Sequence, residues 1–514
     1  MQVPIIVVVV VAVVITVGGI ARRYGLPAPL ILTAFGIAVS YLPFVGRIEL
    51  STDLVLVGLL APLLYAASLR TSLVDFRANA RPIALLSVGL VLFTAVGVGL
   101  VVWWLLPVSL PAAIAVGAVV APPDAVAATA IARRVGMPRR IVTILEGESL
   151  VNDATAIVVL RTAIAAITGT VTLFDVAIDF VVSAAGGFLV GMLVAVVVCR
   201  IRRHVTDTLT DTSISLVTPF ATYLVAEEIH ASGILAVVVT GLLMGHKAPV
   251  VQTAASRIFE RTIWSAIQFV LENTVFLLIG LQAWWITEDL ARTSLSTGRI
   301  VLASAAVLVA VMVLRPVWVF PATYLARLVP AVARRDPSPP WQAPAVISWA
   351  GLRGVVTLAA VFALPEQTEH REVLVLLALV VTAGTLLLQG STLPWLVRRL
   401  GLSAPDPAED ALREAELLQR AASVGLTRLD QIVGSDDPEE IVARLRSRSL
   451  ERANAAWERL AHANTTETPA RSYARLRLEM LRAERDEVLR ARDAGEAPHE
   501  VLQHVLAALD IEES

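Results

Sequence analysis

Acidic, hydroxyl and amide side chains gather in the string E-G-E-S-L-V-N-D at residues 146–153. At helical spacing Ser149 lies four residues before Asp153, and Glu148 lies four before Asn152, so each pair shares one helical face. Such oxygens suit small, hard cations. The string predicts a cation site. Helix–helix hydrogen bonding by the same residues is the alternative, and it explains the serine and asparagine better than the two carboxylates.

Another carboxylate, Asp124, follows two prolines in the string A-P-P-D. Pro122 and Pro123 remove helix donors in the middle of an apolar run, and the carbonyls that they free must line a cavity or meet another helix. Asp124 then begins a second half-helix, whose positive end favours a carboxylate. We expect Asp124 to add an oxygen to the cation site. A proline kink capped by an aspartate is the alternative.

Three arginines, Arg161, Arg315 and Arg353, also lie inside apolar runs. A charge at mid-membrane costs roughly 3 kcal/mol on insertion scales, so it pairs or faces water. The expected partner of Arg315, in V-L-R-P-V-W, is Glu148. Gly351 and Gly354 flank Arg353 and predict a second interrupted helix, with Arg353 near the negative end of a half-helix.

The segments that carry these charged residues have the composition of a membrane protein. Of 514 residues, 56% are hydrophobic and 17% are charged, and the mean hydropathy is +0.73. About a quarter of a soluble domain is charged, so an ordinary soluble enzyme is excluded. A helix needs about 20 apolar residues to cross a bilayer. The candidate spans are 3–20, 28–45, 53–69, 82–106, 110–132, 141–168, 173–199, 212–227, 232–245, 262–287, 300–326, 343–364 and 373–397.

Loop charges orient these thirteen spans. With the N-terminus outside, the inside loops hold 20 basic residues and the outside loops hold 4, as the positive-inside rule requires. The first run, 3–20, has no positive residue before it and is expected to be a transmembrane helix rather than a signal peptide. Arg161, two turns beyond Asp153, is expected to be structural.

The two interrupted runs, 110–132 and 343–364, occupy matching places. Each is the fifth of six spans, and one linking span separates the two sets. This arrangement makes the halves inverted repeats, and matching interruptions point to a transporter site at the repeat interface. The predicted fold is an all-α polytopic membrane protein of about 13 transmembrane helices.

We expect two domains, a transmembrane part at 1–402 with net charge +6 and a soluble helical tail at 403–514 with net charge −8. The tail pattern predicts a helical hairpin around Gly495. Its alternating charges are typical of a solvated face, and a regulatory or dimerising role is the alternative. The lone Cys199 excludes a disulfide framework and a cysteine metal cluster. We expect no metal site at the scattered tail histidines, His462, His499 and His504.

Over nearly all of 1–400 the sequence resembles the monovalent cation/proton antiporters of the NhaP and eukaryotic sodium/proton exchanger type. The matching stretches are ARRYGLPAPLIL, APPDAVAATAI, ILEGESLVNDATAIVV, LVAEEIHASGILAVVVTGLLMGH, LRPVWVFPATYL and WAGLRGVVTLA. E-G-E-S-x-x-N-D and G-L-R-G in this order are highly specific together. The resemblance implies thirteen helices in a core domain and a dimer domain, two unwound helices that cross at mid-membrane, and a homodimer.

The resemblance also implies roles residue by residue. Asp153 matches the aspartate that binds the ion and the proton, and Asn152 matches the asparagine before it. Asp124 matches the aspartate of the unwound helix, and Ser149 matches a coordinating hydroxyl. Na⁺ is thus implied at Asp153, Asp124 and Ser149.

Three more residues match the family's core. Glu148 and Arg315 match a stabilising ion pair, and Arg353 matches the arginine near the second break. The sequence departs from the family pattern at Ala66, Pro123 and Ala125. A glutamate is common at the first of these positions, a hydroxyl residue at the second and a proline at the third. The departures remove oxygen near the site and leave the preference among Na⁺, Li⁺ and K⁺ open.

The hypothesis is that Asp153 binds either a proton or one cation, never both. Burial disfavours the charged form of a carboxylate, so the two ions compete and loading one ejects the other. Family members with two adjacent aspartates are electrogenic, whereas this chain has Asn152 before Asp153. One exchanging charge implies electroneutral 1:1 transport, provided that Asp124 keeps its protonation state.

We therefore expect a secondary active transporter of the plasma membrane for pH and sodium homeostasis, with no cofactor and no nucleic acid partner. K⁺/H⁺ exchange by the same fold is the alternative. An intramembrane aspartyl protease is remote because its Y-D and G-x-G-D strings are absent. A cation channel would move ions without coupled protons. An ATP-driven pump is disfavoured because no nucleotide-binding loop is present.

Overall fold

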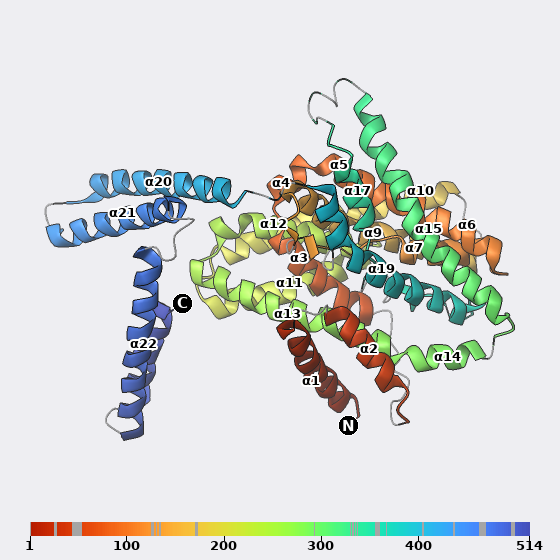
Figure 1. Ribbon diagram of the computed structural model, residues 1–514, viewed down its shortest axis with the longest axis horizontal. Helices are drawn as coiled ribbons and strands as arrows, with labels where there is room; N and C mark the ends of the chain where they lie inside the picture. The colour runs from red at the N-terminus through yellow and green to blue at the C-terminus, as the bar shows by residue number, and fades with distance from the viewer. Residues whose placement is uncertain are drawn as a thin grey trace. The chain divides into compact units, whose positions relative to one another are not determined.

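The computed structural model describes residues 2–24, 28–43, 54–124, 128–129, 131–132, 135–169, 173–291, 293–328, 330, 334, 336, 338–354, 360–365, 367–402, 404, 406–434, 437–461, 469–494 and 499–513. These ranges form helices and short connections, and they contain no strand (Figure 1). The chain divides into two compact units, Met1–Ala404 and Pro405–Ser514. The boundary expected from the sequence was 402/403.

Seven helices in the described ranges are long and apolar enough to cross a membrane, which confirms an all-helical, multi-pass protein. They are Ala80–Leu105, Arg139–Ile167, Phe180–Arg202, Gly233–Val251, Ala254–Glu288, Thr297–Tyr324 and Arg371–Leu400. Shorter apolar helices cover Val8–Ala21, Ala28–Ser40, Leu56–Arg70 and Leu110–Val120. The count of thirteen spans stays a prediction, because the expected spans 110–132 and 343–364 include residues outside the described ranges.

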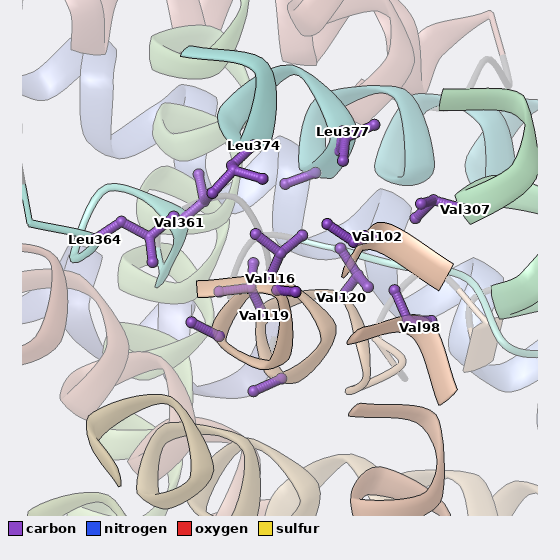
Figure 2. Close-up of a cluster of buried hydrophobic side chains, with 14 of the residues drawn as sticks. Val98, Val102, Val116, Val119, Val120, Val307, Val361, Leu364, Leu374 and Leu377 are labelled. Carbon is purple, nitrogen blue, oxygen red and sulfur yellow. The ribbon is translucent and has the colours of Figure 1, made fainter. Parts of the chain in front are cut away.

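One set of helices, here named the core bundle, packs around an apolar cluster. Its members are α5 (Ala80–Ala84), η2 (Leu85–Leu90), α6 (Val91–Leu105), α7 (Leu110–Val120), α9 (Arg139–Thr168), α15 (Thr297–Tyr324), α17 (Gln342–Trp349) and α19 (Arg371–Leu400). Figure 2 shows the cluster, where Val116 and Val120 of α7 meet Leu374 and Leu377 of α19. All four are almost fully buried. This apolar packing fixes the end of α7, from which the site begins.

The other helices of the first unit, here named the scaffold bundle, include the N-terminus. They are α1 (Gln2–Arg23), α2 (Ala28–Ser40), η1 (Leu54–Leu60), α3 (Ala61–Arg70), α10 (Leu173–Arg202), α11 (Thr208–Glu228), α12 (Gly233–Val251), α13 (Ala254–Leu281) and α14 (Ala283–Ala291). Helix α13 packs on α2, and α12 packs on α3 and α10. The short α4 (Leu73–Ala78) and η3 (Leu325–Leu328) lie in connections.

A buried ionic network joins the ends of four scaffold helices. Arg202 of α10 donates to Asp211 of α11 (Nε–Oδ1 2.6 Å) and to Glu260 of α13 (Nη1–Oε1 3.2 Å). Gln252, at the end of α12, donates to both carboxylates. Because buried charges need partners, this network holds the four helix ends in one arrangement. It belongs to the scaffold and not to the site.

The second unit consists of helices with exposed charged faces. Helices α20 (Pro407–Ile432) and α21 (Glu439–Ala461) lie side by side (Figure 1). Helices α22 (Pro469–Ala494) and α23 (His499–Glu513) pair in the same way, with Leu481 and Leu502 buried. The expected hairpin is thus present, although Gly495 at its turn lies outside the described residues.

Candidate functional site

The first interrupted segment follows α7. The helix ends at Val120, and residues 121–124 are not helical, as the two prolines require. Beyond the break, the backbone N–H of Asp124 donates to the carbonyl of Leu352 at 2.7 Å. Leu352 lies in the second interrupted segment, so the two breaks meet. The freed backbone groups thus bond to protein rather than to lipid, as the membrane interior demands.

The second interrupted segment carries Arg353. Helix α17 ends at Trp349, and residues 351–354 are not helical. The buried Arg353 donates through Nη1 to the carbonyl of Ala121, the residue that follows the last residue of α7. Its backbone N–H donates to Thr385 Oγ1 of α19 at 3.1 Å. A guanidinium at a helix C-terminus compensates the negative end of the helix dipole, which is the placement that the sequence predicted for Arg353.

Two glycines allow this close packing. A Cβ at Gly354 would overlap the Asp124 carboxyl group, and a Cβ at Gly351 would lie 2.5 Å from Cδ of Arg315. A side chain at either place would require Asp124 or Arg315 to move. The string G-L-R-G therefore does more than interrupt a helix, because it lets the Asp124 carboxylate and the Arg315 side chain reach the second break.

Asp153 lies in the middle of α9, beside the first break, with 4% of its surface exposed. The preceding Asn152 is fully buried and donates from Nδ2 to the carbonyl of Pro123 at 2.9 Å. This bond ties the site helix to the interrupted segment. Asp153 and Asp124 are close enough for their charges to interact. These two carboxylates form the acidic centre of the site.

The other polar members of the string differ in environment. Ser149 is half-buried, one turn before Asp153. The Oδ1 atom of Asn152 is buried and makes no hydrogen bond within the described residues. An oxygen held in this way, next to two carboxylates, has the chemistry of a ligand for a hard cation.

A buried ion pair lies one turn from the acidic centre. Arg315 of α15 donates to both oxygens of Glu148, Nη1 to Oε1 at 2.6 Å and Nη2 to Oε2 at 2.8 Å. Arg315 Nε donates to the carbonyl of Ile347 at 3.0 Å. Both charged side chains are at most 1% exposed. The charge of Glu148 is thus balanced by Arg315.

The family model of the transmembrane sodium/hydrogen exchanger matches residues 8–399. The chain belongs to the sodium/hydrogen exchanger family. It is therefore a transporter and not an enzyme, and the resemblance in the sequence is confirmed.

Curated relatives of this exchanger cover most of its length. An uncharacterized Na⁺/H⁺ exchanger of Mycobacterium tuberculosis, Rv2287, is 31% identical over 99% of this chain and 95% of its own. A protein of Bacillus subtilis named as a sodium, potassium, lithium and rubidium/H⁺ antiporter is 29% identical over 98% of this chain and 77% of its own.

A solved structure shares the fold of this exchanger. The sodium/proton antiporter MjNhaP1 of Methanocaldococcus jannaschii superposes with a TM-score of 0.61 at 16% identity. The match covers 76% of this chain and 97% of that chain. The NhaP-type fold predicted from the sequence is therefore confirmed.

The exchanger's structure adds contacts that the sequence did not reveal. Arg161 of α9 donates to both oxygens of Glu227 in α11, at 2.9 and 3.0 Å, and to Tyr223 Oη at 3.3 Å. This half-exposed pair connects the core bundle to the scaffold bundle. Glu227 lies at the end of the predicted span 212–227. A single sequence does not show that this span packs beside Arg161, so the pair could not be predicted.

Two of the sequence departures can be placed in the exchanger. Ala66 of α3 is buried and belongs to an apolar cluster that also includes Leu150 and Ala154 of α9, the site helix. Pro123 is buried at the break and accepts the bond from Asn152. Ala125 lies outside the described residues.

Proposed function

We propose that this protein exchanges Na⁺ for protons across the plasma membrane and that Asp153 is the group the two ions share. The observation that supports this is a nearly buried carboxylate on α9, next to a second carboxylate, where two interrupted helices meet. A carboxylate in this place needs a counter-charge. A proton or a cation supplies it, and the two cannot occupy the same oxygens together. Li⁺ is a second candidate cation.

The neighbouring charges support a single exchanging group. Glu148 is neutralised by Arg315 through two hydrogen bonds, and Arg353 binds the end of α7. Asp153, whose charge interacts with that of Asp124, is the carboxylate that we propose binds the cation or the proton. With Asp124 at constant charge, one Na⁺ replaces one H⁺ at Asp153, and no net charge moves.

Transport in proteoliposomes tests the function. With the full chain reconstituted and the lumen acidic, added external Na⁺ should raise the internal pH, and Li⁺ should do so at a comparable concentration. A response to K⁺ alone would favour K⁺/H⁺ exchange, which is the second candidate because a relative is named for potassium as well as sodium. Cation uptake with no change of internal pH would indicate a channel and contradict the proposal.

Electroneutral exchange predicts a rate that does not depend on membrane potential. Moving one uncompensated charge through about 100 mV involves 2.3 kcal/mol, so an electrogenic cycle can change its rate up to about fifty-fold. We expect less than about a twofold change when the potential is clamped at 0 and then at about −100 mV with equal ion gradients. A steep dependence would rule out 1:1 stoichiometry.

Alternating access requires the core bundle to move against the scaffold bundle. The Arg161–Glu227 contact joins the two bundles near the end of α9, on the face that loop charges assign to the outside. We propose that this contact breaks when the site opens to that face. The remaining finer features are proposals too: a homodimer, an external N-terminus, a cytoplasmic tail, and a role in pH and sodium homeostasis.

The Arg161–Glu227 contact predicts a moderate change in transport. Half-exposed ion pairs contribute about 0.2–1 kcal/mol, so Glu227→Gln should shift the apparent KM for external Na⁺ by about two- to fivefold. Glu228→Gln, an exposed neighbour, is the matched control and should leave KM unchanged. Arg161→Gln in the Glu227→Gln background should add nothing further. Equal effects of Glu227→Gln and Glu228→Gln would disprove the role of the contact.

A further inference from the structure

A cavity of about 70 Å³ lies where the ends of α5, α9, α15 and α17 meet. Its inner wall is apolar and includes Leu86, Ile144, Val319 and Ile347. Its rim is charged and consists of Arg81, Arg140, Arg327 and Asp336. It is separate from the acidic centre, although α9 contributes residues to both.

The rim carries more positive than negative charge. Asp336 accepts from Arg140 Nη2 at 2.5 Å and from Arg327 Nη2 at 2.6 Å, and Arg81 Nη1 is 3.8 Å from its Oδ2. Partial burial of Asp336 raises the pKa of its carboxyl group. The hydrogen bond and charge of Arg140, together with the charges of Arg327 and Arg81, outweigh burial and hold this pKa below the ordinary value. Among the described residues that line the cavity, three guanidinium groups face one carboxylate, which gives this rim a net charge of about +2 for another anion.

The rim lies at the depth of lipid headgroups. Arg81 directly precedes the predicted span 82–106, Arg140 directly precedes 141–168, and Arg327 directly follows 300–326. All three belong to loops that the positive-inside pattern assigns to the cytoplasmic face. Basic pockets between transmembrane helices on that face suit acidic headgroups. The apolar inner wall can pack against the upper part of an acyl chain, whereas it would add no favourable contact to a free phosphate ion.

We propose that this pocket binds one anionic phospholipid, with the phosphate held by Arg140 and Arg327 and with Asp336 as the internal anion that the phosphate displaces. Arginine binds phosphate oxygens through paired N–H groups. The Asp336 carboxylate is already held between Arg140 and Arg327, through one Nη2 atom of each, so the arrangement accepts an anion. The occupant is a headgroup from the cytoplasmic leaflet and not a soluble phosphate.

Native mass spectrometry of the full chain in detergent tests the pocket, with phosphatidylglycerol and phosphatidylcholine of identical acyl chains as probes. Wild type should retain one phosphatidylglycerol in preference to phosphatidylcholine. Arg140→Gln with Arg327→Gln should weaken that binding roughly tenfold or more. Arg398→Gln, an exposed arginine at the same predicted face, is the matched control and should change nothing.

A second variant, which is expected to change phosphatidylglycerol binding in the opposite direction, separates loss of binding from misfolding. Asp336→Asn removes the competing anion, so it should strengthen phosphatidylglycerol binding. Thermal unfolding with inorganic phosphate alone tests whether a soluble phosphate ion occupies the pocket. We expect inorganic phosphate to give no stabilisation at concentrations where phosphatidylglycerol stabilises the protein. Equal retention of the two lipids, weaker binding in Asp336→Asn, or stabilisation by inorganic phosphate equal to that by phosphatidylglycerol would each overturn the proposal.

Discussion

Asp153→Asn should abolish cation-driven proton movement while the protein stays folded. The asparagine amide has nearly the same shape, but it takes up no proton and offers a cation no negative charge. The side chain is nearly buried and shares its surroundings with Asp124, so removing one of two close negative charges does not weaken the fold. We expect the exchange rate in proteoliposomes to fall to that of protein-free vesicles, for Na⁺ and for Li⁺.

The matched control for this variant lies in the same string. Glu146→Gln makes the same acid-to-amide change two turns earlier on α9, on a half-buried residue outside the acidic centre. It should exchange at the wild-type rate. Thermal unfolding of both variants checks that each is folded. Wild-type exchange by folded Asp153→Asn would remove Asp153 from the mechanism, whereas equal loss in both variants would indicate damage to α9 rather than to the site.

The sequence predicted much of this site, because charges inside apolar runs are rare and need partners. Arg315 and Glu148 were paired on that ground, and the structure places them in contact. The broken helices were predicted from Pro122, Pro123 and two glycines for a similar reason, since an interrupted helix exposes backbone groups that only a protein contact can satisfy.

Other features need coordinates, because they depend on which helices pack together. The partner of Arg353 is a backbone carbonyl at the end of α7, and every residue has such a group, so no residue type signals it. The glycines predicted a break but not the approach of Asp124 to Gly354. The cavity beside Asp336 depends on four helix ends whose lining residues run from Arg81 to Ile347 in the sequence.

The second large effect is expected on stability, from Glu148→Gln. Removing one partner of a buried ion pair leaves the other charge uncompensated, which costs about 3–5 kcal/mol. Here the effect should lie toward the upper end, because Glu148 acts electrostatically on Arg353 as well as on Arg315. The Nε and Nη2 atoms of Arg353 make no hydrogen bond within the described residues. Without Glu148, two buried guanidinium groups repel each other and a carboxylate that acts on both of them is gone.

Thermal or denaturant unfolding of the full chain measures this effect, and a second substitution isolates its cause. Arg315→Gln added to Glu148→Gln removes the uncompensated charge, so the double variant should be more stable than Glu148→Gln alone. Glu227→Gln makes the same chemical change in a half-exposed pair and should cost less than about 1 kcal/mol. If Glu148→Gln is as stable as Glu227→Gln, the buried pair does not hold α9 to α15. If the double variant is no more stable than Glu148→Gln, the loss comes from packing and not from charge.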